Sequence, residues 1–198
     1  MSESSPSTRD RLLIAGADLI AEKGFDGASV RDICARAHTS ANMVHHYFAS
    51  KQGLFEAIVE QFGSGVFAVP MRLLDKEPRS RDDFLSRLEL LFESTLDSYI
   101  ENRSVFLAVI REQGDPKALP EYMAALATFL EQAKDRGFVR QELDSDMITG
   151  FILDRILNQV QFAPWIKRNY GLDLIGDPEY RQRWARSNLD VFLNGIVT

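Results

Sequence analysis

The stretch SVRDICARAHTSANMVHHYFASK, residues 29–51, decides the fold of this chain. Ser29 is the expected N-cap of one short helix and Ser40 that of a second, because serine side chains satisfy the free N–H groups of a first helical turn. Val44 and Phe48 share one face of the second helix. Two short helices joined by a tight turn predict a helix-turn-helix unit.

The three histidines of the chain, His38, His45 and His46, all lie in this stretch. Side chains at adjacent helical positions point about 100° apart, and no Asp, Glu or Cys stands in chelating register with the histidines. We therefore expect no metal here, and no other motif implies a cofactor. The alternative is that the histidines belong to an exposed polar face that touches an anionic partner.

Helix start and stop signals continue on both sides of this unit. Ser7, with Asp10 three residues later, caps a first helix, and Gly24 ends it with Phe25 folded back in a Schellman motif. Ser50 caps the helix that follows the unit. No alternation of period two persists, so the predicted fold class is all-α.

Further helices are expected along the rest of the chain. They cover residues 82–101, 104–113 and 120–136, a long segment 145–171 that is bent or ended near Pro164, and a last helix from Pro178, capped by Asp177, to about 196. The helix after Ser50 runs through Phe62. Gly63–Gly65 is either a hinge or a simple helix end, and Pro70 beyond it is expected to kink or end the helix. The prediction is about nine helices, with the helix-turn-helix domain over residues 1–51 and a larger helical domain over 52–198.

Length and composition exclude several classes of protein. The 198 residues are 45% hydrophobic and 26% charged, which is ordinary for a soluble globular protein and argues against wholesale disorder. A single cysteine, Cys34, excludes an internal disulfide framework, and no apolar run reaches the roughly 20 residues that span a bilayer. We expect a cytoplasmic protein.

The charge is distributed unevenly along the chain. The net charge is -6, but six lysines and arginines balance six acids in residues 1–51, so the excess acid lies in residues 52–198. The neutral N-terminal segment also carries all the histidines. It is therefore the part of the chain where a nucleic-acid partner is expected.

Residues 9–55 resemble the DNA-binding domain of the tetracycline-repressor (TetR) family. The resemblance rests on RDRLLIAGADLIAEKGFDGASVRDICARAHTSANMVHHYFASKQGLF, with its Glu-x-Gly-Phe, its x-x-Ile-x-x-x-Ala and its Ser-x-x-x-Val-x-x-Tyr-Phe-x-Ser-Lys-x-x-Leu. It implies a homodimeric transcriptional regulator whose two-fold symmetry fits a near-palindromic DNA operator. It also implies ligand binding and dimerisation by residues 52–198.

Three positions depart from the family pattern. His38 stands where the turn usually has glycine, at a position that needs φ > 0, and histidine tolerates that region better than most other residues. Asn42 replaces a common glycine, and His45 replaces a common tyrosine that touches backbone phosphate. These changes bear on which operator sequence is read.

The resemblance and the outer faces of the two short helices select the residues expected to contact DNA. Arg31 is expected to reach a base edge or a phosphate, since bidentate arginine to guanine is the commonest specific contact. Asn42 can pair with adenine and Met43 can pack on a thymine methyl group, while Lys51 lies at a helix start that favours an anion. The full set is Ser29, Arg31, Ser40, Ala41, Asn42, Met43, His45, His46, Tyr47 and Lys51.

Aromatic and polar side chains on the inward faces of the later helices are candidates for a ligand pocket. The candidates are Phe62, Phe67, Phe92, Tyr99, Phe106, Met123, Phe129, Phe151, Asn158, Gln159, Phe162 and Trp165. Each of the apolar ones is as readily a core residue, because an apolar stripe at helical spacing is typical of packing. Asp154 and Arg155 interrupt the same apolar helix as Asn158 and Gln159, and pairing within the chain or with a dimer partner is favoured for that charged pair.

The last two long helices are expected to form an isologous interface between two copies. Its expected members are Ile148, Ile152, Arg155, Leu189, Phe192, Leu193 and Ile196. Such a dimer presents its two recognition helices about one DNA turn apart, roughly 34 to 36 Å.

These observations predict a ligand-responsive transcriptional repressor that binds double-stranded DNA as a homodimer and is released by a small, largely apolar effector. The alternative is a DNA-binding regulator controlled by a protein partner, or an activator, without a small-molecule ligand. The sequence contains no glycine-rich phosphate loop, zinc motif or nucleophile elbow, so an enzyme is not expected.

Overall fold

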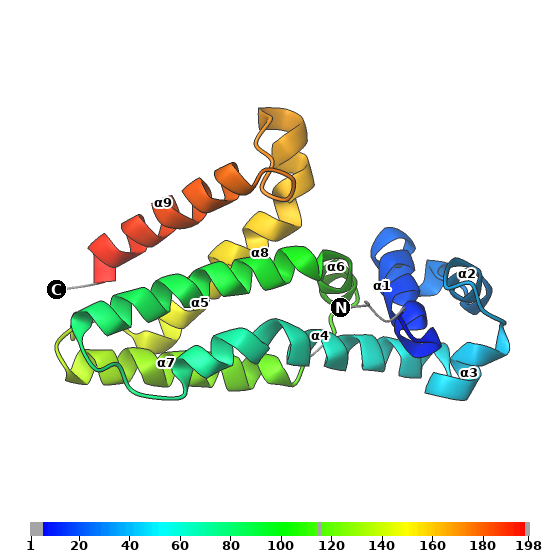
Figure 1. Ribbon diagram of the computed structural model, residues 1–198, viewed down its shortest axis with the longest axis horizontal. Coiled ribbons are helices and arrows are strands. Elements are labelled where there is room, and N and C mark those ends of the chain that lie inside the picture. Colours follow the sequence, from blue (N-terminus) through cyan, green and yellow to red (C-terminus); the bar gives the residue numbers. More distant parts are fainter. Residues whose placement is uncertain (1–5, 115, 197–198) are drawn as a thin grey trace, which may run out of the picture. The chain divides into compact units, whose positions relative to one another are not determined.

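The computed structural model describes residues 6–114 and 116–196, and within these ranges the chain forms nine helices (Figure 1). The helices are α1 (Thr8–Gly27), α2 (Val30–Arg36), α3 (Asn42–Phe48), α4 (Lys51–Leu74), α5 (Arg81–Glu101), α6 (Arg103–Arg111), α7 (Ala118–Asp135), α8 (Ser145–Tyr170) and α9 (Pro178–Ile196). The predicted all-α fold is confirmed. Among the described helices, none combines the length and the apolar composition that a membrane span requires.

The chain divides into two compact units. Unit 1 consists of Met1–Gly65 and Asn102–Lys117, and unit 2 of Val66–Glu101 and Ala118–Thr198. The division falls inside α4, so the first part of that helix belongs to unit 1 and its last part to unit 2. α6 belongs to unit 1, although the helices before and after it belong to unit 2.

α1 begins as the sequence predicts and ends differently. Ser7 Oγ accepts the backbone N–H of Asp10 (3.2 Å), and Asp10 Oδ2 accepts that of Ser7 (3.3 Å), which is the expected capping box. Gly24 has a positive φ of 82°, but its ψ of 166° is not that of a Schellman motif, and a further turn leads to Gly27. The predicted Schellman motif is therefore wrong, because the N–H of Phe25 donates to the side chain of Glu112, the residue that follows α6, instead of to α1.

α4 is longer than the sequence suggests. A helix end at Gly63–Gly65 or at Pro70 is wrong, since the helix continues through both to Leu74. Phe62 is buried in unit 1, and Val66 and Phe67 are buried in unit 2. Burial on both sides of the glycines outweighs the cost of a glycine in a helix, about 1 kcal/mol each.

Unit 1 has an aliphatic core built around α1. This helix packs on α6 and on α2, and α2 packs on α3. The fully buried side chains include Leu12, Ile20, Ile33 and Leu54, and the Phe62 and Phe106 rings stack with centroids 6.1 Å apart.

Unit 2 has an aromatic core between α5, α7 and α8. The Phe67 ring stacks on Tyr122 at 4.7 Å, and the Tyr122 hydroxyl lies 3.1 Å from Thr95 Oγ1. Burial raises the pKa of Tyr122 far above its ordinary value.

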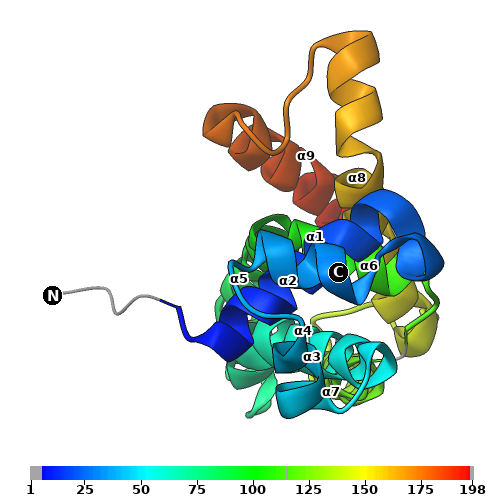
Figure 2. The ribbon, with the colours of Figure 1, turned by 90° about the vertical axis from the view of Figure 1, so that its right-hand side faces the viewer.

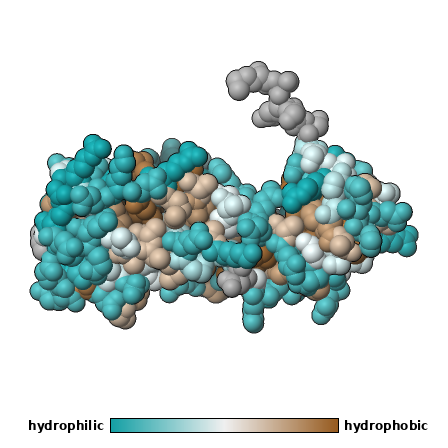
Figure 3. Space-filling model, turned by 90° about the horizontal axis from the view of Figure 1, so that it is seen from below, coloured by the Kyte–Doolittle hydropathy of each residue, from teal (hydrophilic) through white to brown (hydrophobic). Residues whose placement is uncertain are grey.

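On the face drawn in Figure 3, hydrophilic side chains predominate and hydrophobic surface shows only between them.

Helix ends in unit 2 follow the predicted signals. α7 stops at Gly137, which has φ 73°, and the N–H of Phe138 returns to Ala133 O (2.9 Å). The N–H of Tyr180 donates to Asp177 Oδ1 (3.0 Å), so Asp177 is the expected cap of α9. The alternative that α8 ends near Pro164 is wrong, because Pro164 lies inside the helix, which continues to Tyr170.

Candidate nucleic-acid interface

The predicted helix-turn-helix unit is formed by α2, a turn and α3 (Figure 2). Ser29 Oγ accepts the N–H of Asp32 (3.1 Å) and caps α2, as predicted. His38 adopts φ 50° in the turn, the left-handed conformation expected at this position. The N–H of Thr39 donates to Cys34 O (2.9 Å), which closes the turn tightly enough for α3 to follow at once.

α3 turns one apolar face inward and one polar face outward. Val44 and Phe48 are buried, as predicted, while His45 and His46 are exposed. The predicted cap at Ser40 is wrong, because no side chain caps this helix and Ser40 contributes only its carbonyl, to the N–H of Met43 (3.1 Å).

The residues expected to contact DNA lie mainly at the surface. The exposed ones are Ser29, Arg31, Ser40, Ala41, Asn42, His45, His46 and Tyr47, and the half-buried ones are Met43 and Lys51. Arg31 forms no ion pair with any described residue, so its guanidinium is available to a base edge or a phosphate. The Tyr47 ring meets His46 edge-on at 4.8 Å.

The junction between α3 and α4 needs a glycine. Ser50 Oγ accepts the N–H of Gly53 (2.9 Å) and caps α4, as predicted. A Cβ on Gly53 would lie 2.1 Å from Phe48 O, so the two helices approach closely only because that position has no side chain. Ala49 turns the chain between the helices with φ 62°.

Lys51 has a partner inside unit 1. Its Nζ donates to Phe25 O (2.8 Å) and lies 4.2 Å from the centroid of the Phe25 ring. The ammonium therefore holds the end of α1 against the start of α4 as a hydrogen-bond donor and through a cation–π contact. Its remaining N–H groups are the only ones available to a phosphate.

Sequence reasoning missed two arginines of α1. Arg11 Nε donates to Ala37 O (3.1 Å), the carbonyl at which α2 ends and the turn begins. The guanidinium of Arg9 lies 5.5 Å from the centroid of the Phe48 ring, which places an exposed cation beside α3. Neither contact could be predicted from the sequence, because the spacing of apolar residues along α1 indicates only which face of the helix is buried.

Two adjacent residues at the end of α6 hold the end of α1. Glu112 Oε1 accepts the N–H of Phe25 (2.8 Å), and Arg111 Nη1 donates to Ala21 O (3.1 Å) and Glu22 O (3.2 Å). A Cβ on Gly24 would lie 3.2 Å from the Arg111 guanidinium. We call this set the α1–α6 clasp, and its members lie too far apart in sequence for any local pattern to predict it.

One exposed ion pair joins α1 to α2. Arg36 donates to both carboxylate oxygens of Glu22 (2.8 and 3.0 Å), and this bidentate hydrogen bonding lowers the pKa of Glu22. Both side chains are exposed, so the ion pair contributes little to the stability of the fold. The Arg36 guanidinium is nevertheless already paired with Glu22. Among the described residues, no group of three or more His, Cys, Asp or Glu side chains is placed to hold a metal ion.

Comparisons with known proteins agree with this geometry. The family model described as "Bacterial regulatory proteins, tetR family" matches residues 12–58. The HTH-type transcriptional repressor KstR2 of Mycobacterium tuberculosis H37Rv is 25% identical over 96% of this chain and 94% of its own length. Residues 12–58 of this chain belong to the TetR family of bacterial regulatory proteins. The family consists of regulators and not of enzymes.

Solved structures share the fold of this TetR-family regulator. The ketosteroid transcriptional regulator KstR2 of M. tuberculosis superposes with a TM-score of 0.75 and 24% identity over 98% of this chain and 97% of that one. FadR from Bacillus subtilis, solved in complex with stearoyl-CoA, superposes with a TM-score of 0.70 and 17% identity over 93% of this chain and 97% of that one.

The structure of the regulator does not gather the predicted ligand-pocket residues in one place. Phe62 and Phe106 are buried in unit 1, and Phe67, Phe92, Tyr99, Phe129 and Gln159 are buried in unit 2. Met123, Phe151, Asn158, Phe162 and Trp165 are exposed, and all of these except Met123 lie on α8.

The predicted dimer residues of the regulator also fall into two groups. Ile148, Ile152 and Leu189 are buried inside unit 2, whereas Phe192 and Leu193 are half-buried and Arg155 is exposed. The side chain of Ile196 lies outside the described residues. The surface of α8 that is open to a partner is therefore formed mainly by side chains that the sequence assigned to the pocket.

Proposed function

We propose that this regulator is a ligand-responsive repressor that binds a near-palindromic operator as a homodimer and is released by a small, largely apolar effector. The observation that carries the proposal is the two-faced α3, with Val44 and Phe48 buried and a polar face exposed. In a helix-turn-helix unit such a face lies in the DNA major groove.

The outward side chains of α2 and α3 supply the chemistry for reading DNA. Arg31 can donate to the acceptor edge of guanine, and Asn42 can pair with adenine. His45 and His46 can contact phosphate or base edges on the same face. A single helix of seven residues offers few such contacts, so two symmetry-related helix-turn-helix units are needed for specific binding to an operator.

The nature of the effector is inferred from unit 2 and from the described relatives. One solved relative is described as a ketosteroid regulator and another was solved with stearoyl-CoA, both with large apolar parts. The aromatic core of unit 2 supports a similar class of effector here. Within it, the hydroxyls of Thr95 and Tyr122 can hydrogen-bond a carbonyl group if the rings separate to admit the ligand.

A second candidate function is regulation by a protein partner without a small-molecule ligand. The close stacking of Phe67 on Tyr122, and of Phe92 on Trp184 at 5.8 Å, favours it, because an already filled core leaves a ligand no free volume. Under the first candidate, the effector binds a minor, opened state and shifts the population towards it.

The test is selection of bound fragments from a random genomic DNA pool by the purified full chain, followed by titration of the selected site. We expect a near-palindromic site bound at nanomolar concentration and at physiological salt. Steroid and fatty acyl-CoA compounds are then added, and at least one should lower operator affinity. A selected pool with no common sequence would overturn the DNA-reading role, and tighter binding on effector addition would make the system one of corepression.

A further inference from the structure

A groove of 660 Å³ in unit 1 lies outside the helix-turn-helix unit, between the first part of α4 and the segment that follows α6. We call it the α4–α6 groove. Phe55 and Val59 line it, and each keeps only 8% of its surface exposed. Gly114 also lines it, and a Cβ at this glycine would lie 3.0 Å from Val59 and 3.4 Å from Phe55. The segment after α6 therefore packs directly on α4 at an apolar floor.

An unusual residue shapes the end of α6 beside this groove. The N–H of Gly114 donates to Val109 O (2.8 Å) and that of Gln113 to Ile110 O (3.3 Å), which together form a Schellman motif. Gln113 has φ 53° at the position where glycine is usual, so its backbone is strained. Its side chain is exposed and lines the groove. Strain of this kind is typical of residues that bind a partner.

Carboxylates surround the apolar floor. Glu56 and Glu60 are exposed and lie one helical turn apart on α4. Glu56 accepts a hydrogen bond from Gln52 (3.2 Å), whereas Glu60 has no hydrogen bond or ion pair with a described residue. Glu112 of the α1–α6 clasp is the third carboxylate, and Lys117 is the one cation among the described lining residues. The described lining thus has more negative than positive charge.

From the apolar floor and the acidic rim we infer that the α4–α6 groove binds an amphipathic helix of a protein partner, with lysines or arginines beside its apolar side chains. The apolar side chains enter the groove over Phe55 and Val59, as in helix-in-groove recognition. The cations pair with Glu56 and Glu60 at the rim. The inference rests on the second candidate function above and names the chemistry of its protein partner.

The combination of surfaces selects this occupant over others. An acidic helix would bring its carboxylates against those of the groove, and such a juxtaposition of like charges is strongly unfavourable. A small cation would pair with the rim but would leave the apolar floor in contact with water. A cationic helix satisfies both parts of the groove at once.

Glu112 connects the groove to the helix-turn-helix unit. Its Oε1 accepts the N–H of Phe25 (2.8 Å) and lies 3.8 Å from Arg111 Nε. A cation of the partner competes for this carboxylate, because hydrogen bonds between two charged groups are stronger than those from a backbone amide. The end of α1 then loses one of its contacts, and α1 packs on α2, which packs on α3. Partner binding should therefore lower operator affinity, and operator binding should weaken the partner by the same factor.

A synthetic helix tests the groove on the full chain. The probe is a labelled peptide of about 14 leucines and lysines in amphipathic order, and fluorescence anisotropy at physiological salt measures its binding. We expect a dissociation constant in the micromolar range. The double variant Glu56→Lys and Glu60→Lys should raise it at least tenfold, and a peptide with glutamates in place of the lysines should not bind. Circular dichroism confirms that the variant folds.

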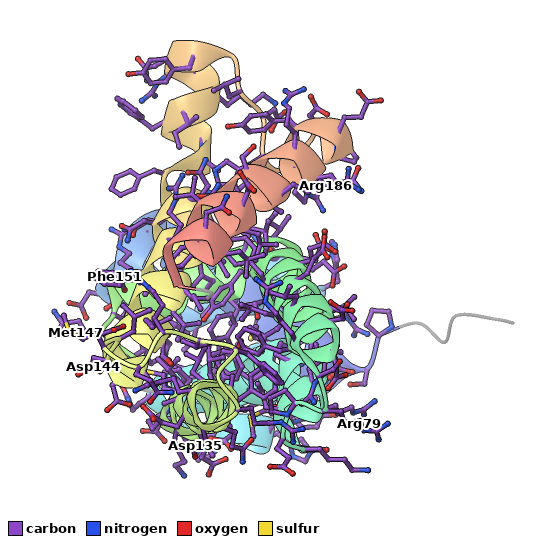
Figure 4. All side chains as sticks on the ribbon, turned by 90° about the vertical axis from the view of Figure 1, so that its left-hand side faces the viewer. Arg79, Asp135, Asp144, Met147, Phe151 and Arg186 are labelled. Carbon is purple, nitrogen blue, oxygen red and sulfur yellow. The ribbon has the colours of Figure 1, made fainter. Side chains whose placement is uncertain are left out.

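The matched control makes the same change of charge in unit 2. It is the double variant Asp135→Lys and Glu142→Lys, whose native side chains are both exposed, and Figure 4 shows Asp135 at the surface. This control should bind the lysine peptide as the native chain does. It separates binding in the groove from general attraction between a cationic peptide and an acidic protein.

The effect on DNA is measured with the operator selected from the genomic pool. The lysine peptide should lower the operator affinity of the native chain about fivefold and should raise the exchange rate of the Phe25 amide hydrogen. A cationic peptide can also bind DNA directly. The variant Glu56→Lys and Glu60→Lys controls for this, because the peptide should change its operator affinity much less.

The outcomes separate this inference from the proposed function. Weaker peptide binding in the groove variant alone, together with lower operator affinity, supports the inference. A lysine peptide that does not bind the native chain, or binds all three chains equally, overturns the groove as a docking site and leaves DNA reading untouched. Binding in the groove without any change in operator affinity or Phe25 exchange overturns the link through Glu112. A native chain that binds the peptide but selects no operator overturns the repressor proposal and not the groove.

Discussion

Helices α3 and α8 both expose one face, and the two faces have opposite chemistry. The seven-residue α3 hides Val44 and Phe48 and shows polar side chains, whereas the 26-residue α8 shows large apolar side chains around two charges. The difference indicates the kind of partner. A polar, hydrogen-bonding face suits a hydrated groove of DNA, and an apolar face suits a surface that excludes water.

The two faces are also held in different ways. Contacts from other parts of unit 1 fix α3, including Arg11 on the carbonyl of Ala37 and the close approach that Gly53 allows. α8 is a long helix that packs on α5 and α7 and needs no such support. The exposed face of α3 therefore depends on residues far along the chain, whereas the exposed face of α8 depends mainly on the side chains of α8 itself.

Breaking the apolar face of α8 should have the largest effect. Phe151→Arg places a cation on the exposed apolar face of α8 and removes an aromatic ring from it, so the dissociation constant of the proposed dimer should rise roughly 100-fold or more. Operator affinity at low protein concentration should fall with it, although α3 is untouched. Sedimentation equilibrium and fluorescence anisotropy measure the two effects.

The matched control is Met123→Arg on α7, a partly exposed apolar side chain outside the α8 face. This variant should dimerise and bind the operator as the native chain does. If Phe151→Arg remained dimeric, the α8 face would not be the interface, whatever its hydrophobicity.

The outward side chains of α2 and α3, among them Arg31 and Asn42, form what we call the reading face. Removing a single group from this face should have the next largest effect. Arg31→Ala should lower operator affinity by about 1 to 3 kcal/mol, or roughly 5- to 150-fold, if the guanidinium contacts guanine. The salt dependence of binding distinguishes the alternatives, since loss of a phosphate contact would also reduce the slope by about one. The control is Arg36→Ala in the same helix, whose guanidinium is already paired with Glu22.

The sequence predicted which side of α3 is buried but not which side of α8 is exposed, for physical reasons. Residues 29–51 combine caps, a turn and a short apolar face, and these local signals specify which side of α3 is buried. α8 has apolar residues on more than one side, so periodicity alone cannot separate Ile148 and Ile152, which are buried, from Phe151 and Phe162, which are exposed. Burial depends on neighbours far along the chain.

Weakening the α1–α6 clasp should have a smaller effect on the reading face. Glu112→Ala removes the acceptor of the Phe25 N–H, a loss of roughly 1 kcal/mol for a partly exposed bond, and should lower operator affinity by about fivefold. The exchange rate of the Phe25 amide hydrogen, measured by NMR, should rise in parallel. Glu112→Gln keeps an acceptor oxygen and should behave nearly as the native chain. An unchanged exchange rate in Glu112→Ala would mean that the bond does not persist in solution.

The smallest effect concerns the start of α8 and depends on pH. Hydrogen bonds from Ser145 Oγ (2.5 Å) and from Lys134 Nζ (3.0 Å) hold the pKa of Glu131 below its ordinary value. A carboxyl whose folded pKa is lowered stabilises the fold above its unfolded pKa, near 4.3, and loses that contribution as the pH falls through the folded value. Ser145→Ala should therefore reduce the fall in Tm between pH 5 and pH 3 without changing dimerisation, because the exposed face of α8 stays intact. An equally steep fall in this variant would mean that other carboxylates control the acid stability of unit 2.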